Sequence, residues 1–199
     1  MKAFGSNGHH FRLLFVIIFL SLAAACNETK RGEQDFVGEE EDKNFAVDAT
    51  YSNLAEIRMG EMAQTKAVSE SVKQFGETMV REHSTALEQL RKIADEQGID
   101  LPDTVKKQDK QIEEEISGLE GAAFDSAYML HQVEAHQKAQ QLFERGANND
   151  RNPDLKDYAI STLEHINMHL KMAKEVKEEL DSSEGNRSGI ARDSIDNQP

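Results

Sequence analysis

Four residues of this sequence have side chains that could bind a metal ion or move a proton, at positions that a helical core would bury. Glu56, His83, His136 and His169 each interrupt an apolar stripe of a predicted helix, near the middle of that helix. Imidazole and carboxylate groups are ligands for zinc, copper and iron. Because the midpoints of packed helices meet at one level whichever way the helices run, we predict that these four side chains meet in the core. His165 lies one helical turn before His169 and could face the same ion.

The spacing excludes one well-known kind of metal centre. Di-iron carboxylate bundles carry a Glu-x-x-His pair on each of two helices, and no histidine from His83 onward has a glutamate three residues before it. A ferroxidase is therefore not expected. Motifs for a nucleophile elbow, a phosphate loop or a zinc protease are also absent from the sequence. We predict no catalytic residues, and the metal hypothesis is a zinc, copper or iron site with three histidines and one carboxylate.

A buried hydrogen-bonded network is the alternative explanation for the same residues. A lone carboxylate in an apolar core is costly unless it is protonated or paired, so Glu56 would bond to one or two of the histidines and to Tyr128. Asp125 and Gln132 lie on the same stripe as His136 and would belong to this network. Asp125 also lies early in its helix, where it could oppose the helix dipole. The sequence leaves both explanations open.

The elements that must position these residues are five helices. Apolar periodicity and capping signals predict them at residues 44–67, 69–98, 103–119, 122–148 and 153–180. Gly98 follows one predicted helix end, and Pro153 begins the last helix. Four of the helices are long and carry apolar residues at alternating three- and four-residue steps, which is typical of an antiparallel bundle core. The predicted fold class is all-α, a four-helix bundle with an additional shorter crossover helix between the second and third long helices.

Short motifs along most of the chain resemble those of a known family. They are, in order, Ala55-Glu56-x-x-x-Gly60-x-x-Ala63, Met79-Val80-x-Glu82-His83, Leu101-Pro102, Phe124-Asp125-x-x-Tyr128, His136 and His169-Leu170-x-x-Ala173. In order and spacing they resemble domain of unknown function 4142, a ferritin-like family of exported bacterial proteins, over about residues 45–176. Glu82 departs from the pattern, since the family tends to have Asp there. The resemblance implies an exported ferritin-like four-helix bundle without an established activity. Its recurrent polar positions fall on Glu56, His83, Asp125, Tyr128, His136 and His169.

The N-terminal residues predict export. Residues 1–12 are basic, residues 13–22 are almost wholly apolar, and three alanines precede Cys26, the only cysteine. This pattern is typical of a secretory signal over residues 1–25, and the cysteine at the cut predicts a lipoprotein acylated on Cys26. Ala23 stands where the usual lipobox has leucine, so ordinary cleavage after Ala25 stays an alternative. The predicted location is the periplasmic side of the outer membrane or, without the lipid, the soluble periplasm.

Composition predicts the segments around the bundle and limits its partners. Residues 26–43 are predicted to form a lipidated cysteine and a flexible acidic tether, residues 44–180 the bundle, and residues 181–199 a disordered tail. The net charge of −14 argues against nucleic acid and anionic lipid surfaces as partners. The membrane is then a partner through the N-terminal lipid anchor alone, and the sequence identifies no protein partner.

Two functions agree with these features. The first is a non-enzymatic lipoprotein of the cell envelope, with an interaction or stress-related role. The second is a periplasmic protein that stores, senses or carries a transition metal at the predicted Glu and His site.

Overall fold

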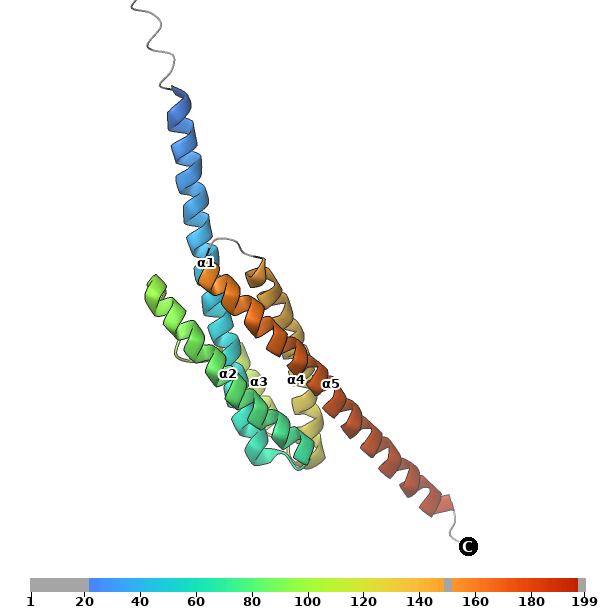
Figure 1. Ribbon diagram of the computed structural model, residues 1–199. Coiled ribbons are helices and arrows are strands. Elements are labelled where there is room, and N and C mark those ends of the chain that lie inside the picture. Colours follow the sequence, from blue (N-terminus) through green and yellow to red (C-terminus); the bar gives the residue numbers. More distant parts are fainter. Residues whose placement is uncertain (1–21, 149–151, 197–199) are drawn as a thin grey trace, which may run out of the picture. The chain divides into compact units, whose positions relative to one another are not determined.

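The computed structural model describes the backbone of residues 22–148 and 152–196, and the side chains of residues 39–148 and 152–183. This part of the chain contains five helices and no strand (Figure 1). They are α1 (Leu22–Lys66), α2 (Glu70–Gln97), α3 (Lys107–Ser117), α4 (Gly121–Ala147) and α5 (Pro153–Asp196). The predicted all-α class, with four long helices and a shorter one between the second and third, is confirmed. Among these helices, none has a stretch long and apolar enough to cross a bilayer.

The chain divides into two compact units, residues 1–40 and residues 41–199. The first contains the beginning of α1, which starts at Leu22 rather than near residue 44. In the second unit, α5 continues to Asp196, past the predicted end at residue 180. The backbone of the predicted tether and of most of the predicted tail is therefore helical. Once a helix is nucleated, each further residue adds one hydrogen bond, and no proline lies between residues 26 and 43 to stop it.

The structure does not test the prediction of export. Residues 1–21 of the predicted signal lie outside the described residues, and so do residues 197–199 of the predicted tail. The side chain of Cys26 also lies outside them.

Local signals account for the end of α2 and the start of α5. Gly98 ends α2 in the left-handed conformation, with φ of 67°, as a glycine after a helix is expected to do. Pro153 is the first residue of α5, where the side-chain oxygen of Asn152 accepts bonds from the backbone N–H groups of Asp154 and Leu155 at 3.0 Å. The crossover helix α3 begins at Lys107, four residues later than predicted, and the expected cap Asp103 precedes it.

A close approach of α1 and α2 sets the register between these two helices. A Cβ atom on Gly60 would lie 2.7 Å from the carbonyl oxygen of Gly76, and one on Gly76 would lie 2.8 Å from the Cβ of Ala63. Only glycine leaves room for the two backbones at this distance. Asn53 lies seven residues before Gly60, and His83 seven residues after Gly76. Since α1 and α2 run in opposite directions, this register places Asn53 opposite His83.

Two apolar clusters fill the core of the bundle. We name the first the Met79 cluster; it consists of Met59, Ala63, Ala67, Val72, Phe75, Met79, Ile116, Phe124, Tyr128, Met129 and Ala173. The second, the Phe143 cluster, consists of Phe45, Ala46, Ala49, Leu90, Ala139, Phe143, Leu155, Tyr158, Ala159 and Ile166. Between them along the long helices lies a polar layer, which consists of Asn53, Glu56, His83, Gln132, His136 and His169, all buried. The core is therefore polar near its middle, as the interrupted stripes predict.

Candidate metal centre

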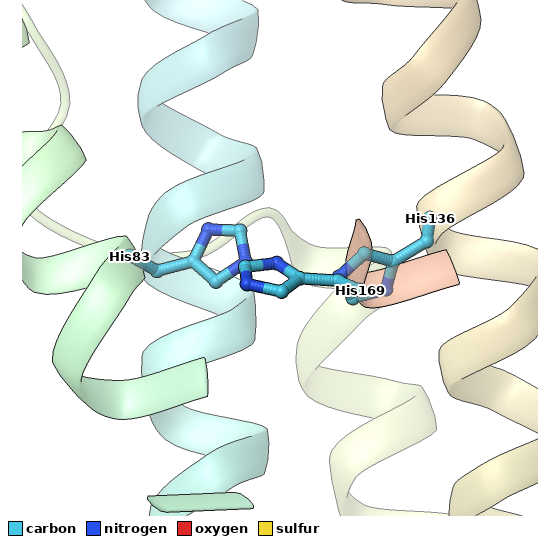
Figure 2. A group of neighbouring side chains, drawn as sticks. All are labelled: His83, His136 and His169. Carbon is cyan, nitrogen blue, oxygen red and sulfur yellow. The ribbon is translucent and has the colours of Figure 1, made fainter. Parts of the chain in front are cut away.

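Three histidines from three helices converge in the polar layer. His83 on α2, His136 on α4 and His169 on α5 are 4%, 1% and 2% exposed. Figure 2 shows the three rings gathered side by side. Their centroids lie 5.3–5.8 Å apart, and one nitrogen from each ring lies within 4.8 Å of the other two. Such a group of imidazoles from separate helices is an arrangement that can hold a metal ion.

Each of the three rings donates one N–H outward, away from the group. His83 Nδ1 donates to Asn53 Oδ1 at 2.9 Å, and His136 Nδ1 donates to the carbonyl oxygen of Gln132 at 2.9 Å. His169 Nε2 donates to Glu82 Oε2 at 2.8 Å. Each outward acceptor places the proton on the nitrogen it faces and so selects one tautomer.

The amide of Asn53 is oriented by its other bonds. Its Nδ2 group donates to the carbonyl oxygen of Ala49 at 2.9 Å and to Tyr158 Oη at 3.0 Å. The oxygen is therefore the atom that faces His83, and the His83 ring must supply the hydrogen.

The second nitrogen of each ring holds a lone pair and has no partner. These atoms are His83 Nε2, His136 Nε2 and His169 Nδ1, which are buried and make no hydrogen bond among the described residues. Buried polar atoms are nearly always paired, so three unpaired nitrogens in one group require an explanation. Metal-binding histidines have this pattern, in which one nitrogen binds the ion and the other donates to a carboxylate or carbonyl.

Burial lowers the pKa of two of the three rings, His83 and His169, and so favours the neutral form that binds metals. The pKa of His83 lies well below the usual 6.5 because of burial first, and then because of the neighbouring rings of His136, His169 and His165. Burial, together with His136, lowers the pKa of His169 to about 4, although Glu82 opposes the shift. A metal ion therefore does not compete with protons for these two rings at neutral pH.

Glu56 lies beside this group and does not converge with it. Its Oε1 atom is 4.0 Å from His136 Nδ1, which is the outward nitrogen of that ring, and this distance is too long for a hydrogen bond. Its Oε2 atom is buried and makes no hydrogen bond among the described residues. The predicted meeting of four side chains is thus observed for the three histidines. The helical stripe places Glu56 in the core, but it does not determine which edge of His136 the carboxylate faces.

The residues predicted for a polar network lie in two places. Tyr128 and Gln132 are buried, and neither the Tyr128 hydroxyl nor the Gln132 amide has a partner in the described part of the chain. Burial, and then the charge of Glu56, raises the pKa of Tyr128 well above 10. Asp125 instead accepts hydrogen bonds from the backbone N–H groups of Val68 and Ser69, at 3.2 and 2.8 Å. It therefore holds the connection between α1 and α2 against α4.

Comparison with known proteins identifies the family. The chain matches the family described as "Domain of unknown function (DUF4142)" over residues 28–176. The chain belongs to this family. Among curated proteins, none matches the chain.

Solved structures show the same fold at low sequence identity. One is a protein from Streptomyces coelicolor that is described as a secreted protein of the DUF305 type. It is 12% identical to this chain, with a TM-score of 0.61, over 71% of this chain and 94% of that one. CopM in its Cu(II)-bound form is 14% identical, with a TM-score of 0.60, over 69% of this chain and 96% of CopM. CopM in its Cu(I)-bound form is 16% identical, with a TM-score of 0.58 and the same coverage. At these identities, the comparison shows that the DUF4142 chain shares their helical fold.

His165 lies outside the group of three rings. Its side chain is 55% exposed, and its Nδ1 atom is 3.1 Å from Glu82 Oε2, the same oxygen that accepts from His169. A pocket of about 310 Å³ between α2 and α5 is lined by His83, Glu82, His165 and His169. His165 of this DUF4142 chain therefore lies on the solvent side of the buried group and does not share its centre.

Two residues of the centre were not predicted from the sequence. Asn53 lies off the apolar stripe that we assigned to its helix, and Glu82 lies next to His83 but about 100° around α2. An asparagine one helical turn before Glu56 is a weak sequence signal for a site residue on its own. Glu82 could be found only from its contacts with α5, which is more than 80 residues away in the sequence.

Proposed function

We propose that this protein binds a transition-metal ion in the bacterial cell envelope, with His83, His136 and His169 as its ligands. One observation carries the proposal. All three buried rings donate one N–H outward to a fixed acceptor, and all three leave the other nitrogen without a partner. The sequence favoured an interaction role without a metal, and the convergence of the three rings now reverses that order.

The unpaired nitrogens argue against a purely structural network. Leaving a buried polar atom unpaired costs about 1–3 kcal/mol of folding stability. In a purely structural network, three such atoms would destabilise the fold with no compensating interaction. The outward nitrogens of His83 and His169 do bond across helices, to Asn53 and Glu82, but among the described contacts no ring bonds to another ring or to Glu56. Coordination of a metal ion would satisfy all three nitrogens at once.

The ligand set favours copper or zinc. Three imidazole ligands suit both metals, and copper binds more tightly to nitrogen ligands in the usual order of divalent ions. Bonds of about 2.0 Å in tetrahedral geometry would place the ligand nitrogens about 3.3 Å apart, closer than the 4.8 Å within which one nitrogen of each ring lies here. Small rotations of the rings would close this difference. CopM, which shares the fold, has Cu(II)-bound, Cu(I)-bound and Ag-bound forms, so copper is the first ion to test.

The role that fits this site is binding and release, not catalysis. The three rings are nearly inaccessible, and the sequence supplies no catalytic motif beside them. We propose that the protein stores or carries the ion after export through the signal at residues 1–25. Acylation of Cys26 would hold it at the outer membrane, and without acylation it would be soluble in the periplasm. Acyl labelling of the wild type against Cys26→Ser distinguishes these two locations.

The proposal is tested by metal-dependent stabilisation of the purified protein. Adding Cu(I), Cu(II) or Zn²⁺ should raise the melting temperature, because an ion at 100 times its Kd adds about 2.7 kcal/mol to the free energy of unfolding. His136→Gln should abolish the rise. His131→Gln is the matched control, since His131 lies on the same helix outside the group and should leave the rise intact. An unchanged melting temperature with every ion would overturn the proposal.

A further inference from the structure

The buried centre needs a route by which an ion can reach it. The pocket between α2 and α5 supplies one, because His83 and His169 form part of its wall. Its outer part is formed by Glu82 and His165, whose side chains are 25% and 55% exposed. Groups of the type that bind metals therefore run along the pocket from solvent to the buried rings.

One carboxylate oxygen connects the outer and inner parts of this route. Glu82 Oε2 accepts from His169 Nε2 at 2.8 Å and from His165 Nδ1 at 3.1 Å. The bond to His169 orients a buried ring, and Glu82 alone is sufficient for that. The bond to His165 is exposed and contributes little stability. Orienting the buried site therefore does not explain why an imidazole lies at this position.

We propose that His165 and Glu82 form an outer binding position through which the metal ion passes to His83, His136 and His169. This inference rests on the proposed function. Because Nδ1 of His165 donates to Glu82, its Nε2 atom holds the lone pair that would bind the arriving ion. The ion would then exchange His165 and water for the inner imidazoles. Only coordinate bonds change in this step, and the ion keeps its oxidation state.

Charge at the pocket mouth makes the proposal more specific. The net charge of −14 favours the approach of cations. Arg81, whose Nη2 atom is 2.8 Å from Glu82 Oε1, opposes it locally. Its guanidinium lies next to the outer position without binding the buried rings. Removing this charge should therefore speed uptake, whereas removing His165 should slow it.

The test is the rate of Zn²⁺ and Cu²⁺ uptake by the purified protein, measured by stopped flow, together with the equilibrium Kd. His165→Ala should lower the uptake and release rates together, by on the order of tenfold, and leave Kd within about twofold of the wild type. Arg81→Gln should raise the uptake rate. Gln89→Ala, at another residue that lines the pocket, is the control and should change neither quantity.

The outcomes separate this inference from the proposed function. A wild-type uptake rate in His165→Ala would overturn the outer position while leaving the buried site intact. A rise in Kd without a slower uptake would also overturn it, because His165 would then act on the bound state. If neither Cu(I), Cu(II) nor Zn²⁺ raises the melting temperature of the wild type, the proposed function fails and the inference fails with it.

Discussion

The Phe143 cluster and the polar layer are neighbours on the same helices, and they differ in whether their buried polar atoms have hydrogen-bond partners. In the cluster, the rings of Phe45, Phe143 and Tyr158 pack edge-on or tilted, 5.5–6.4 Å apart, and the Tyr158 hydroxyl accepts a bond from Asn53. In the layer, three ring nitrogens of similar burial have no partner among the described residues. The fold can thus satisfy a polar atom next to a place where it does not. The three nitrogens share the layer with the unpaired Glu56 Oε2 atom and the unpaired Gln132 amide, and they are the atoms that a bound metal ion would pair.

Asn53 joins the two regions, and its loss should have the largest effect on stability. Asn53→Ala removes the acceptor of His83 Nδ1 and the donor to Tyr158 Oη, both in the buried core. We expect a loss of about 2–5 kcal/mol in the free energy of unfolding, measured by urea denaturation. Asn167→Ala, which removes an exposed bond to Gln140, is the control and should cost less than about 0.5 kcal/mol. Equal losses in the two variants would contradict the role given to Asn53.

Acid should destabilise the protein through the polar layer. The folded-state pKa values of His83 and His169 lie below the unfolded value near 6.5, so the unfolded chain binds more protons at acidic pH. Stability is therefore complete above pH 6.5 and falls as the pH drops toward the His169 pKa of about 4. Each ring contributes a slope of about 1.4 kcal/mol per pH unit, or about 3 kcal/mol from His169 over this range.

Urea denaturation of the metal-free protein at a series of pH values measures this slope. His169→Leu should lower the slope between pH 4 and 6.5 by the amount that corresponds to one proton taken up on unfolding. A slope in His169→Leu equal to that of the wild type would show that the acid sensitivity arises elsewhere.

The close approach of α1 and α2 gives an intermediate effect. Gly76→Ala places a Cβ atom 2.8 Å from the Cβ of Ala63, so the two helices must separate. We expect a cost of about 1–3 kcal/mol and weaker metal binding, because the register that pairs Asn53 with His83 is disturbed. The control is Gly118→Ala, whose Cβ would meet its nearest atom at 3.4 Å and should be tolerated. Normal metal affinity in a destabilised Gly76→Ala protein would show that metal binding does not depend on the register between α1 and α2.

The smallest effect on the metal-free protein is expected at His136. His136→Leu removes an unpaired nitrogen and one bond to a carbonyl oxygen, and replaces the ring with an apolar side chain. Without metal, its stability should be within about 1 kcal/mol of the wild type or higher. A hydrogen-bonded network would instead lose several kcal/mol, so thermal denaturation of the two metal-free proteins distinguishes the explanations.

The level at which the histidines meet could be predicted from the sequence, but their hydrogen bonds could not. The midpoint of a helix is independent of topology, which is why His83, His136 and His169 were found together. The direction in which a ring nitrogen points depends on partners such as Asn53 and Glu82, and these lie off the apolar stripes. Glu56 faces the outer edge of His136, which periodicity cannot specify, and Asp125 binds the backbone of the α1–α2 connection more than 50 residues earlier in the chain. Such contacts between distant segments require the structure.

X-ray absorption of the copper-loaded protein tests the central claim most directly. The proposed site predicts one copper ion per chain, surrounded by three imidazole nitrogens at about 2.0 Å. This imidazole coordination should be lost in His136→Leu but not in His131→Gln. Copper bound in other proportions, without imidazole ligands, or equally well in His136→Leu, would contradict the assignment of His83, His136 and His169 as the metal site.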